Sequence, residues 1–240
     1  MKQRKIFDIH THILPGVDDG SDSMRTTMKM LKMAYRQGAR AVIATPHGSA
    51  SRVSPSQCRD LLEMIQEKSQ KELPKLKLYL GEEVFYSRES VQHLNRGKLI
   101  TMADTSYVLT EFPYTISYRD LYSAVRELVW ARYRPILAHI ERYSCLRDSD
   151  CTEELSECGA YLQINFSSIG GSCLNSTVRW SRRQLMAGRI HFLGSDMHNL
   201  KSRRPEFVKA IEWMERHLEE DYLGEILWKN AKKMVRDEQV

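Results

Sequence analysis

Short apolar runs alternate with helical patterns along the whole chain, and this alternation constrains the fold more than any other feature. Parallel β-α-β units are predicted by such an alternation. Seven strands suit an open doubly wound sheet poorly and are close in number to the eight of a closed barrel. We therefore expect an α/β fold, a distorted seven-stranded (β/α) TIM-like barrel. The expected strands are residues 6–9, 41–44, 77–80, 107–110, 136–138, 161–165 and 190–194. The expected helices are residues 23–37, a segment opening at Ser54-Pro55, and residues 87–95, 118–132, 152–158, 178–187, 205–219 and 222–235.

The length and composition predict one domain over residues 1–240. The chain has 240 residues, 42% of them hydrophobic, which suffices for one large core. We find no internal repeat, and Ser167–Ser172 reads as a flexible loop that is too short for a linker. The five cysteines form no C-x-x-C pair, which indicates reduced thiols.

The charge distribution argues against several classes of partner. The net charge is +5, but Lys and Arg are spread along the chain without a polybasic tail or an aromatic-spaced basic stripe. We therefore expect no nucleic-acid partner and only a modest preference for anionic substrates. The sequence contains no signal-peptide core and no apolar segment of membrane-spanning length, so we expect a cytoplasmic protein without direct membrane insertion. The sequence leaves the oligomeric state open, including a homo-oligomer.

Polar side chains follow all the expected strands except the sixth, at the point where each strand ends. The carboxyl ends of all barrel strands meet at one face, where enzymes of this fold keep their active sites. Side chains spread over most of the chain are therefore expected to converge on one mouth. These side chains are His10, His12, His47, Glu82, Glu83, Glu111, His139, Asp196 and His198.

The residue types at this mouth predict a metal centre. Imidazole and carboxylate ligands without cysteine suit Zn, Mn, Fe or Mg. There are more donors than one tetrahedral ion takes, so we expect two or three ions bridged by carboxylates. Any one of these histidines alone could be a hydrogen-bonded loop residue. His191 lies at the start of the seventh strand, at the opposite face, and is expected to be structural, as are His93 and His217 on helices.

These motifs also resemble a known family. The segments D-I-H-T-H-I-L-P-G-V-D-D-G, T-P-H, G-E-E, E-F-P, A-H-I-E-R-Y and S-D-M-H-N are similar to those of the PHP (polymerase and histidinol phosphatase) superfamily. More narrowly, they resemble the bacterial manganese-dependent protein-tyrosine phosphatases of capsule and exopolysaccharide loci. The resemblance covers the whole chain in order, and A-H-I-E-R-Y together with S-D-M-H-N is its most specific part.

The resemblance implies three divalent ions, with Mn favoured and Fe, Zn or Mg as alternatives. It favours Glu83 over Glu82 and Asp18 over Asp19. It also implies that Arg142 and Arg203 bind the phosphate. Because Arg204 adjoins Arg203, the resemblance leaves open which of these two neighbours is the second arginine. The implied ligands are His10, His12, Glu83 and Asp196 for one ion, Glu83, Glu111 and His139 for a second, and His47, His198 and Asp18 for a third.

The expected function is a metal-dependent protein-tyrosine phosphatase. Its metal centre would supply hydroxide that attacks phosphorus in line with the departing phenolate. By resemblance the partner is a phosphotyrosine protein, a bacterial tyrosine kinase that controls capsule or exopolysaccharide synthesis. The alternatives are a small-molecule phosphoesterase such as a histidinol-phosphate phosphatase, and a binding domain without activity, because one fold hosts many functions.

One competing motif is rejected as the catalytic site. Residues Cys173 to Arg179 have the C-x5-R spacing of cysteine-based phosphatases, in which a thiolate attacks phosphorus. That loop normally carries a glycine inside it, and here the glycines precede the cysteine. We therefore expect thiol alkylation to leave activity intact and chelation to abolish it.

Overall fold

A closed ring of parallel strands forms the centre of the molecule. The computed structural model describes residues 4–48, 53–147 and 151–240. Two hydrogen-bonded runs make up the ring, one in the order β1-β2-β3 and one in the order β4-β5-β6-β7-β8, and every pairing is parallel. The strands are β1 (Ile6–Thr11), β2 (Ala39–Ala44), β3 (Lys77–Leu80), β4 (Glu83–Phe85), β5 (Tyr107–Glu111), β6 (Arg134–Leu137), β7 (Tyr161–Asn165) and β8 (Phe192–Gly194).

The two runs join into one barrel. Only Gly81 and Glu82 separate β3 from β4, so these two strands occupy one position of the ring. The other closure lies between β1 and the segment after β8, where the Asp196 N–H donates to the His10 carbonyl (2.9 Å) and the His12 N–H donates to the Met197 carbonyl (3.0 Å). The expected distorted seven-stranded barrel is therefore confirmed.

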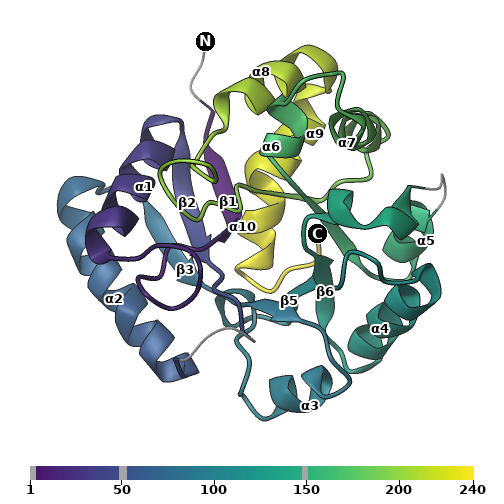
Figure 1. The fold of residues 1–240 in the computed structure, drawn as a ribbon, viewed down its shortest axis with the longest axis horizontal. Coiled ribbons are helices and arrows are strands. Elements are labelled where there is room, and N and C mark those ends of the chain that lie inside the picture. The colour runs from purple at the N-terminus through teal and green to yellow at the C-terminus, as the bar shows by residue number, and fades with distance from the viewer. Residues whose placement is uncertain (1–3, 49–52, 148–150) are drawn as a thin grey trace.

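Helices surround the barrel in the order that the sequence predicts (Figure 1). Two of them start where the sequence predicted and are capped there, because Ser23 Oγ accepts the Thr26 N–H and Ser54 forms a capping box with Gln57. Residues 167–170, expected in a loop, form a helical turn. The helices are α1 (Met24–Arg36), α2 (Pro55–Glu72), α3 (Ser90–Asn95), α4 (Tyr118–Trp130), α5 (Cys151–Glu157), α6 (Ser167–Gly170), α7 (Ser176–Met186), α8 (Val208–His217), α9 (Glu220–Gly224) and α10 (Asn230–Met234). Shorter turns are η1 (Met102–Asp104), η2 (Ile140–Arg142), η3 (Ser144–Leu146) and the π-helical η4 (Glu225–Lys229).

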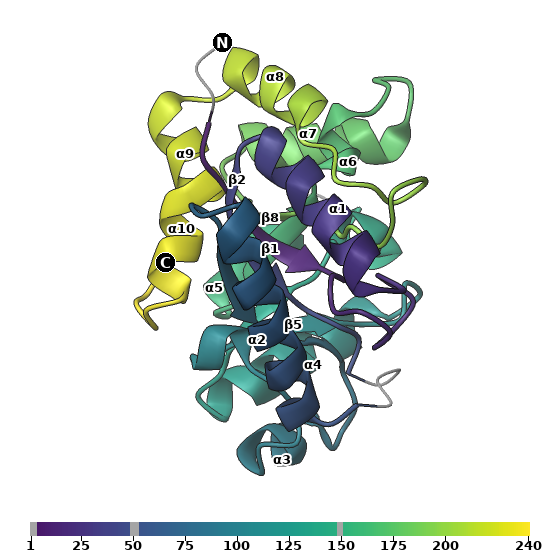
Figure 2. The ribbon, with the colours of Figure 1, turned by 90° about the vertical axis from the view of Figure 1, so that its left-hand side faces the viewer.

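The C-terminal segment closes one end of the barrel. The inward side chains near the amino ends of the strands are largely aromatic and cluster with Ala231 and Met234 of α10. The helices α9 and α10, yellow in Figures 1 and 2, lie against this end. His191 also lies here, where its Nδ1 accepts the Leu162 N–H (3.1 Å), as expected for a structural histidine. The opposite end, where the carboxyl ends of the strands meet, is the end at which barrel enzymes have their active sites.

Among the described helices, none is both long enough and apolar enough to cross a membrane.

Candidate metal centre

Four donor atoms from three strand ends meet at the barrel mouth. The Nε2 atoms of His10 and His12 lie 3.2 Å apart. Glu83 Oε2 lies 3.2 Å and 3.3 Å from these two nitrogens, and Asp196 Oδ1 lies 3.6 Å and 3.4 Å from them. Four donors placed tetrahedrally about 2.1 Å from one ion would be about 3.4 Å apart. The four atoms, which belong to the set that the family resemblance implies for one ion, therefore have the spacing of a cation's ligand shell.

A second group shares Glu83. His139 Nε2 lies 2.8 Å from Glu83 Oε1 and 3.5 Å from Glu111 Oε1. His47 Nδ1 approaches the same carboxylates, at 3.1 Å from Glu83 Oε2 and 3.9 Å from Glu111 Oε2. Because the two oxygens of Glu83 face different neighbours, this carboxylate has the geometry of a bridge between two ions.

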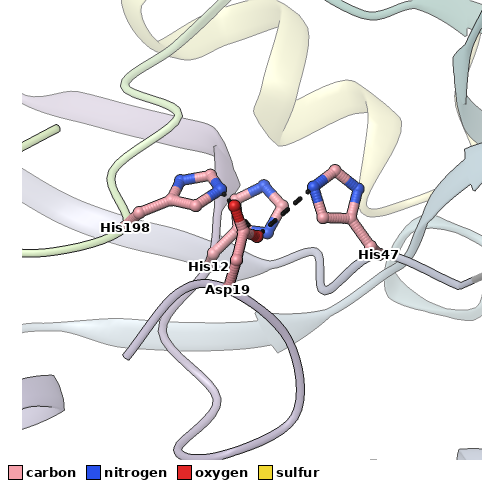
Figure 3. A group of neighbouring side chains, drawn as sticks. All are labelled: His12, Asp19, His47 and His198. Atoms are coloured by element: carbon pink, nitrogen blue, oxygen red, sulfur yellow. Dashed lines mark ion pairs between the residues drawn. The ribbon is translucent and has the colours of Figure 1, made fainter. Parts of the chain in front are cut away.

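The third group contains Asp19 in place of Asp18 (Figure 3). Asp19 Oδ1 lies 3.3 Å from His198 Nε2 and 3.6 Å from His47 Nε2, and donor atoms of His12 lie within the same group. Asp18 points elsewhere, because its Oδ2 accepts from His12 Nδ1 (2.7 Å) and from the His47 N–H (3.0 Å). The expectation that Asp18 would be the donor beside His47 and His198 does not match this arrangement.

Hydrogen bonds behind the rings aim their Nε2 atoms at the centre. The Nδ1–H groups donate outward: His12 to Asp18, His198 to the Asp196 carbonyl (2.9 Å), and His10 to Gln163 Oε1 (3.3 Å). The carboxylate, carbonyl and amide oxygens only accept, so Nδ1 carries a proton in each ring and Nε2 is the nitrogen that remains to bind a metal ion in place of a proton. Metal-binding histidines are oriented in this way.

Sequence reasoning missed Gln163 and Asn165. Gln163 Oε1 also accepts the His139 N–H (2.7 Å), and Asn165 Nδ2 donates to Asp196 Oδ2 (3.2 Å). Both lie within β7, the one strand without a polar cluster after its end. Two amides alternating with apolar residues in Tyr161–Asn165 were the available signal, because alternate positions of a strand face the same side.

Two of the expected ligands have left-handed backbone conformations. His139 has a φ of 35° and Asp196 a φ of 54°, which are uncommon for residues other than glycine. Such conformations cost energy and persist where surrounding contacts enforce them, often at functional sites. Here the enforcing contacts are the hydrogen bonds of both backbone N–H groups, to Gln163 Oε1 and to the His10 carbonyl.

The electrostatics of the cluster favour cations. Burial alone would raise the pKa of Glu83, but His10, His12 and His139 outweigh it and hold this pKa well below its usual value. Burial, together with the charge of Glu83, raises the pKa of Glu111 to about 7. Burial lowers the pKa of His139 to about 4, so this ring is neutral and its lone pair is free at neutral pH.

Buried atoms without hydrogen-bond partners also indicate that this cluster suits metal ions. Glu83 Oε2, Asp196 Oδ1 and His198 Nε2 are buried and have no hydrogen-bond partner among the described residues. Buried polar groups without partners are rare and call for an explanation such as an ion. The imidazole and carboxylate donors suit Mn, Fe, Zn or Mg. The residues present therefore fit a multi-metal centre.

Two arginines flank the cluster. Arg142 Nη2 donates to Asp196 Oδ2, and Arg203 Nη2 forms an ion pair with the same oxygen (2.7 Å). Both guanidinium groups line a cavity of about 350 Å³ above Asp196. Arg204 instead pairs with Glu206 (3.3 Å), so the geometry places Arg203 beside the donor cluster.

Two other candidates lie outside the cluster. Glu82 turns away from Glu83 and accepts the Ile100 N–H (2.8 Å) through Oε2. Cys173 is exposed before α7, and Arg179 Nη1 donates to the carbonyls of Cys173 and Leu174. The C-x5-R segment therefore does not form a phosphate-binding loop around the thiol.

Comparisons with known proteins show which proteins this chain resembles. The family model for capsular polysaccharide synthesis, CpsB/CapC, matches residues 6–236. The tyrosine-protein phosphatase YwqE of Bacillus subtilis (strain 168) is 32% identical over 238 residues, which cover 98% of this chain and 93% of YwqE. The tyrosine-protein phosphatase CpsB of Streptococcus agalactiae is 27% identical over 242 residues, which cover 97% of this chain and 99% of CpsB.

Solved structures show the same relationship. A crystal structure from work on YwqE of Bacillus subtilis and CpsB of Streptococcus pneumoniae, described as unique metal-dependent tyrosine phosphatases, has a TM-score of 0.89 at 31% identity. The match covers 98% of this chain and 96% of that chain. A phosphotriesterase homology protein from Escherichia coli has a TM-score of 0.60 at 11% identity, which shows a shared fold.

Proposed function

Since this chain belongs to the CpsB/CapC family of capsular polysaccharide synthesis and is a metal-dependent tyrosine-protein phosphatase, we propose that the donor cluster at the barrel mouth holds its metal ions. The observation that carries the proposal is the spacing of four donors from His10, His12, Glu83 and Asp196, which lie 3.2 to 3.6 Å apart where measured. Burial would lower the pKa of His10 and of His12, but the carboxylates Glu83 and Asp196 outweigh it and raise the pKa of both rings. The cluster therefore attracts positive charge at these nitrogens, which a bound metal ion would supply in place of the protons.

We allocate three ions among these ligands, with Mn favoured over Fe, Zn and Mg. Asp19 replaces Asp18 in the third set because it, and not Asp18, faces His47 and His198. The proposed sets are His10, His12, Glu83 and Asp196; Glu83, Glu111 and His139; and Asp19, His47 and His198.

The chain's own residues hold the phosphate in position. When bound, the metal ions lower the pKa of a coordinated water and neutralise charge on the phosphate. Arg142 and Arg203 are both anchored on one oxygen of Asp196, which holds the two guanidinium forks at the cavity. Each planar fork can donate to two phosphoryl oxygens and stabilise the charge that spreads over them in the transition state.

The depth of the cluster supports a substrate whose phosphate is carried by a long aromatic side chain. His10, His12 and Glu83 are at most 1% exposed, so only a substrate group that projects far from its backbone reaches them. Tyr114, which is 50% exposed, stands at the rim with its hydroxyl 3.3 Å from Arg142 Nη1 and offers a ring for an aromatic substrate. We propose that the substrate is a phosphotyrosine of a bacterial tyrosine kinase that controls capsule or exopolysaccharide synthesis.

Metal removal and return test the proposal. Purified protein is analysed for bound metals, treated with a chelator and reloaded with Mn²⁺, and each form is assayed on a phosphotyrosine peptide and on histidinol phosphate. We expect chelation to abolish peptide hydrolysis and Mn²⁺ to restore it. A strong preference for histidinol phosphate would favour the small-molecule alternative, and a metal-loaded protein without aryl-phosphatase activity would contradict the assignment.

A pair of adjacent arginines provides a matched test of the phosphate site. Arg203→Lys keeps the charge but removes the fork, and we expect kcat/KM to fall about tenfold or more because hydrogen bonds to charged groups contribute about 1.5 to 3 kcal/mol. Arg204→Lys, at the neighbouring position, is expected to change kcat/KM for a simple aryl phosphate much less. Alkylation of the exposed Cys173 is expected to leave activity intact.

A further inference from the structure

The cavity above Asp196 extends beyond the phosphate arginines. Besides Arg142 and Arg203, its lining includes Lys201 and Arg204. Its volume of about 350 Å³ is larger than a phosphate group requires, since a water molecule occupies about 30 Å³ of liquid. The space next to the phosphate arginines therefore accommodates further parts of a substrate.

One of the cations that line this cavity has no carboxylate partner in the described part of the chain. Arg142 and Arg203 are directed at Asp196, and Arg204 is paired with Glu206 (3.3 Å). Lys201 is exposed, and within the described part of the chain no carboxylate forms an ion pair with its ammonium group. A phosphate on the two arginines would leave Lys201 as the uncompensated charge at the rim.

The loop that carries Lys201 is fixed to the metal centre. The N–H groups of His198 and Asn199 both donate to the Arg203 carbonyl, at 2.9 Å and 3.2 Å. Asn199 Oδ1 accepts the N–H groups of Lys201 (2.9 Å) and Arg203 (3.2 Å) from inside the loop. Lys201 is thus held at a defined place between a proposed metal ligand and a phosphate arginine.

The cavity continues along the surface in one direction. Ser167 and Glu206 line both this cavity and a neighbouring one of about 190 Å³ between α6 and α8. The second cavity is also lined by Gly170, Gly171 and Lys209, and its cation Lys209 lies 3.7 Å from Glu206. The two cavities form a path along which a peptide chain can leave the phosphate site.

We propose that Lys201 is the centre of an anion-binding subsite that takes an acidic side chain close to the phosphotyrosine of the substrate peptide. The proposal rests on the proposed function, and it makes this enzyme selective for acidic phosphotyrosine sequences. The phosphate would occupy Arg142 and Arg203, the peptide would follow the path past Ser167 and Glu206, and a carboxylate within three residues of the phosphotyrosine would pair with Lys201.

Paired peptides and a charge reversal test the subsite. Phosphotyrosine peptides that carry Glu at positions within three residues of the phosphotyrosine are compared with peptides that carry Gln there, and kcat/KM is measured with Mn²⁺ at low ionic strength. An exposed ion pair of 0.2 to 1 kcal/mol gives a preference of about two- to fivefold for the Glu peptide. We expect Lys201→Met to bring this ratio to about one and Lys201→Glu to invert it.

The controls separate the subsite from the chemistry. Lys68→Met, at an exposed lysine of α2, is expected to keep the wild-type ratio, and raised salt is expected to reduce the ratio through screening. Comparing two peptides on the same variant cancels any general loss of activity. Equal kcat/KM for the Glu and Gln peptides in a wild-type enzyme that hydrolyses p-nitrophenyl phosphate would overturn the subsite alone, as would an unchanged ratio in Lys201→Glu. A wild-type enzyme that does not hydrolyse p-nitrophenyl phosphate would overturn the proposed function and the subsite with it.

Discussion

Two adjacent aspartates have different roles at the mouth. Asp19 is 63% exposed at its side chain and faces His198 and His47, whereas the side chain of Asp18 is fully buried behind His12. Burial raises the pKa of Asp18, but its hydrogen bonds with His12, His47 and Gly20 outweigh this effect and lower the pKa to about 2. Asp18 therefore stays ionised and holds the His12 ring by a charged hydrogen bond.

Asp18→Asn is predicted to weaken metal binding without removing a ligand. The amide loses the charge that orients His12 Nδ1–H, and loss of such supporting bonds typically costs about 10- to 100-fold in metal affinity. Titration of the chelated protein with Mn²⁺ by calorimetry measures the change. Asp22→Asn, an exposed neighbour on the same loop, is the control and is expected to bind as the wild type does. An unchanged affinity in Asp18→Asn would show that His12 is held by other contacts.

At the scale of strands and helices, most of the barrel could be predicted from the sequence. Apolar runs separated by helical patterns located the strands, and Ser54 with Pro55 marked a helix start. The division of the third strand could not be predicted, because it depends on tertiary packing. Gly81 lies where a Cβ atom would be 2.6 Å from Met102 Sδ, and the chain there changes its pairing from β2 to β5.

The side chains of the mouth were predictable in type but not in direction. Barrel topology brings the strand ends together, so the histidines after β1, β2 and β6 could be assigned to one site. Within a turn, adjacent residues such as Asp18 and Asp19 point in different directions that only the folded backbone determines. Gln163 acts from inside a strand and carries no motif, so its role depends on contacts with His10 and His139.

Tyr107 links β5 to the C-terminal segment. Its ring is fully buried in the barrel, its hydroxyl donates to the Glu238 carbonyl (2.8 Å), and the Val240 N–H donates to it (3.3 Å). We predict that Tyr107→Phe lowers the free energy of unfolding by about 1 kcal/mol, the typical net value of one such hydrogen bond. Urea denaturation measures this loss. The phosphatase kcat/KM is expected to be unchanged, because the bond lies at the end opposite the mouth.

Tyr133→Phe is the matched control for that variant. Its hydroxyl donates to Asn95 Oδ1 (2.9 Å) at an exposed position, so we expect a smaller loss. Equal unfolding curves for Tyr107→Phe and the wild type would mean that the other contacts of the C-terminal segment, including those of Ser106 and Arg134 with Asp237, hold it without the Tyr107 hydroxyl.

His191 is predicted to make the β7–β8 junction sensitive to acid. Burial lowers its pKa from 6.5 to about 4, and its neutral Nδ1 accepts the Leu162 N–H. A folded pKa below the unfolded one means that the stabilisation is complete above pH 6.5 and is lost as the pH falls towards 4. Allowing for the partial exposure of His191, we expect the free energy of unfolding of the wild type to fall by about 2 kcal/mol over this pH range because of this histidine. His191→Gln is expected not to show this loss.

Urea denaturation at several pH values measures this difference. Comparing the two proteins under the same conditions cancels the titration of the mouth histidines, which both share. His93→Gln, on α3, is the control and is expected to follow the wild type. Parallel pH profiles for His191→Gln and the wild type would contradict a role of this histidine in acid sensitivity.

The two ends of the barrel differ in the side chains that they carry. The aromatic layer and α10 fill one end of the barrel, and the other end collects donors that lie on or directly after β1, β2, β4, β5, β6 and β8. Ions held at the mouth would therefore connect nearly every position of the ring, including the closure between β1 and the segment after β8. Since binding ligands stabilise only the folded state, the metal content should set the stability of the entire barrel.

Metal loading is predicted to raise the melting temperature of the whole molecule in one cooperative transition. Ligand at 100 times its dissociation constant adds about 2.7 kcal/mol per site. For a chain of 150 to 250 residues each kcal/mol corresponds to about 2–4 °C, so one tightly filled site raises the melting temperature by about 5–11 °C. Calorimetry of chelated protein over a series of Mn²⁺ concentrations measures the shift, and Asp18→Asn should require about 10- to 100-fold more metal for the same shift. A melting temperature independent of Mn²⁺ would mean that the donor cluster does not bind the metal, because any ion bound selectively by the folded barrel must stabilise it.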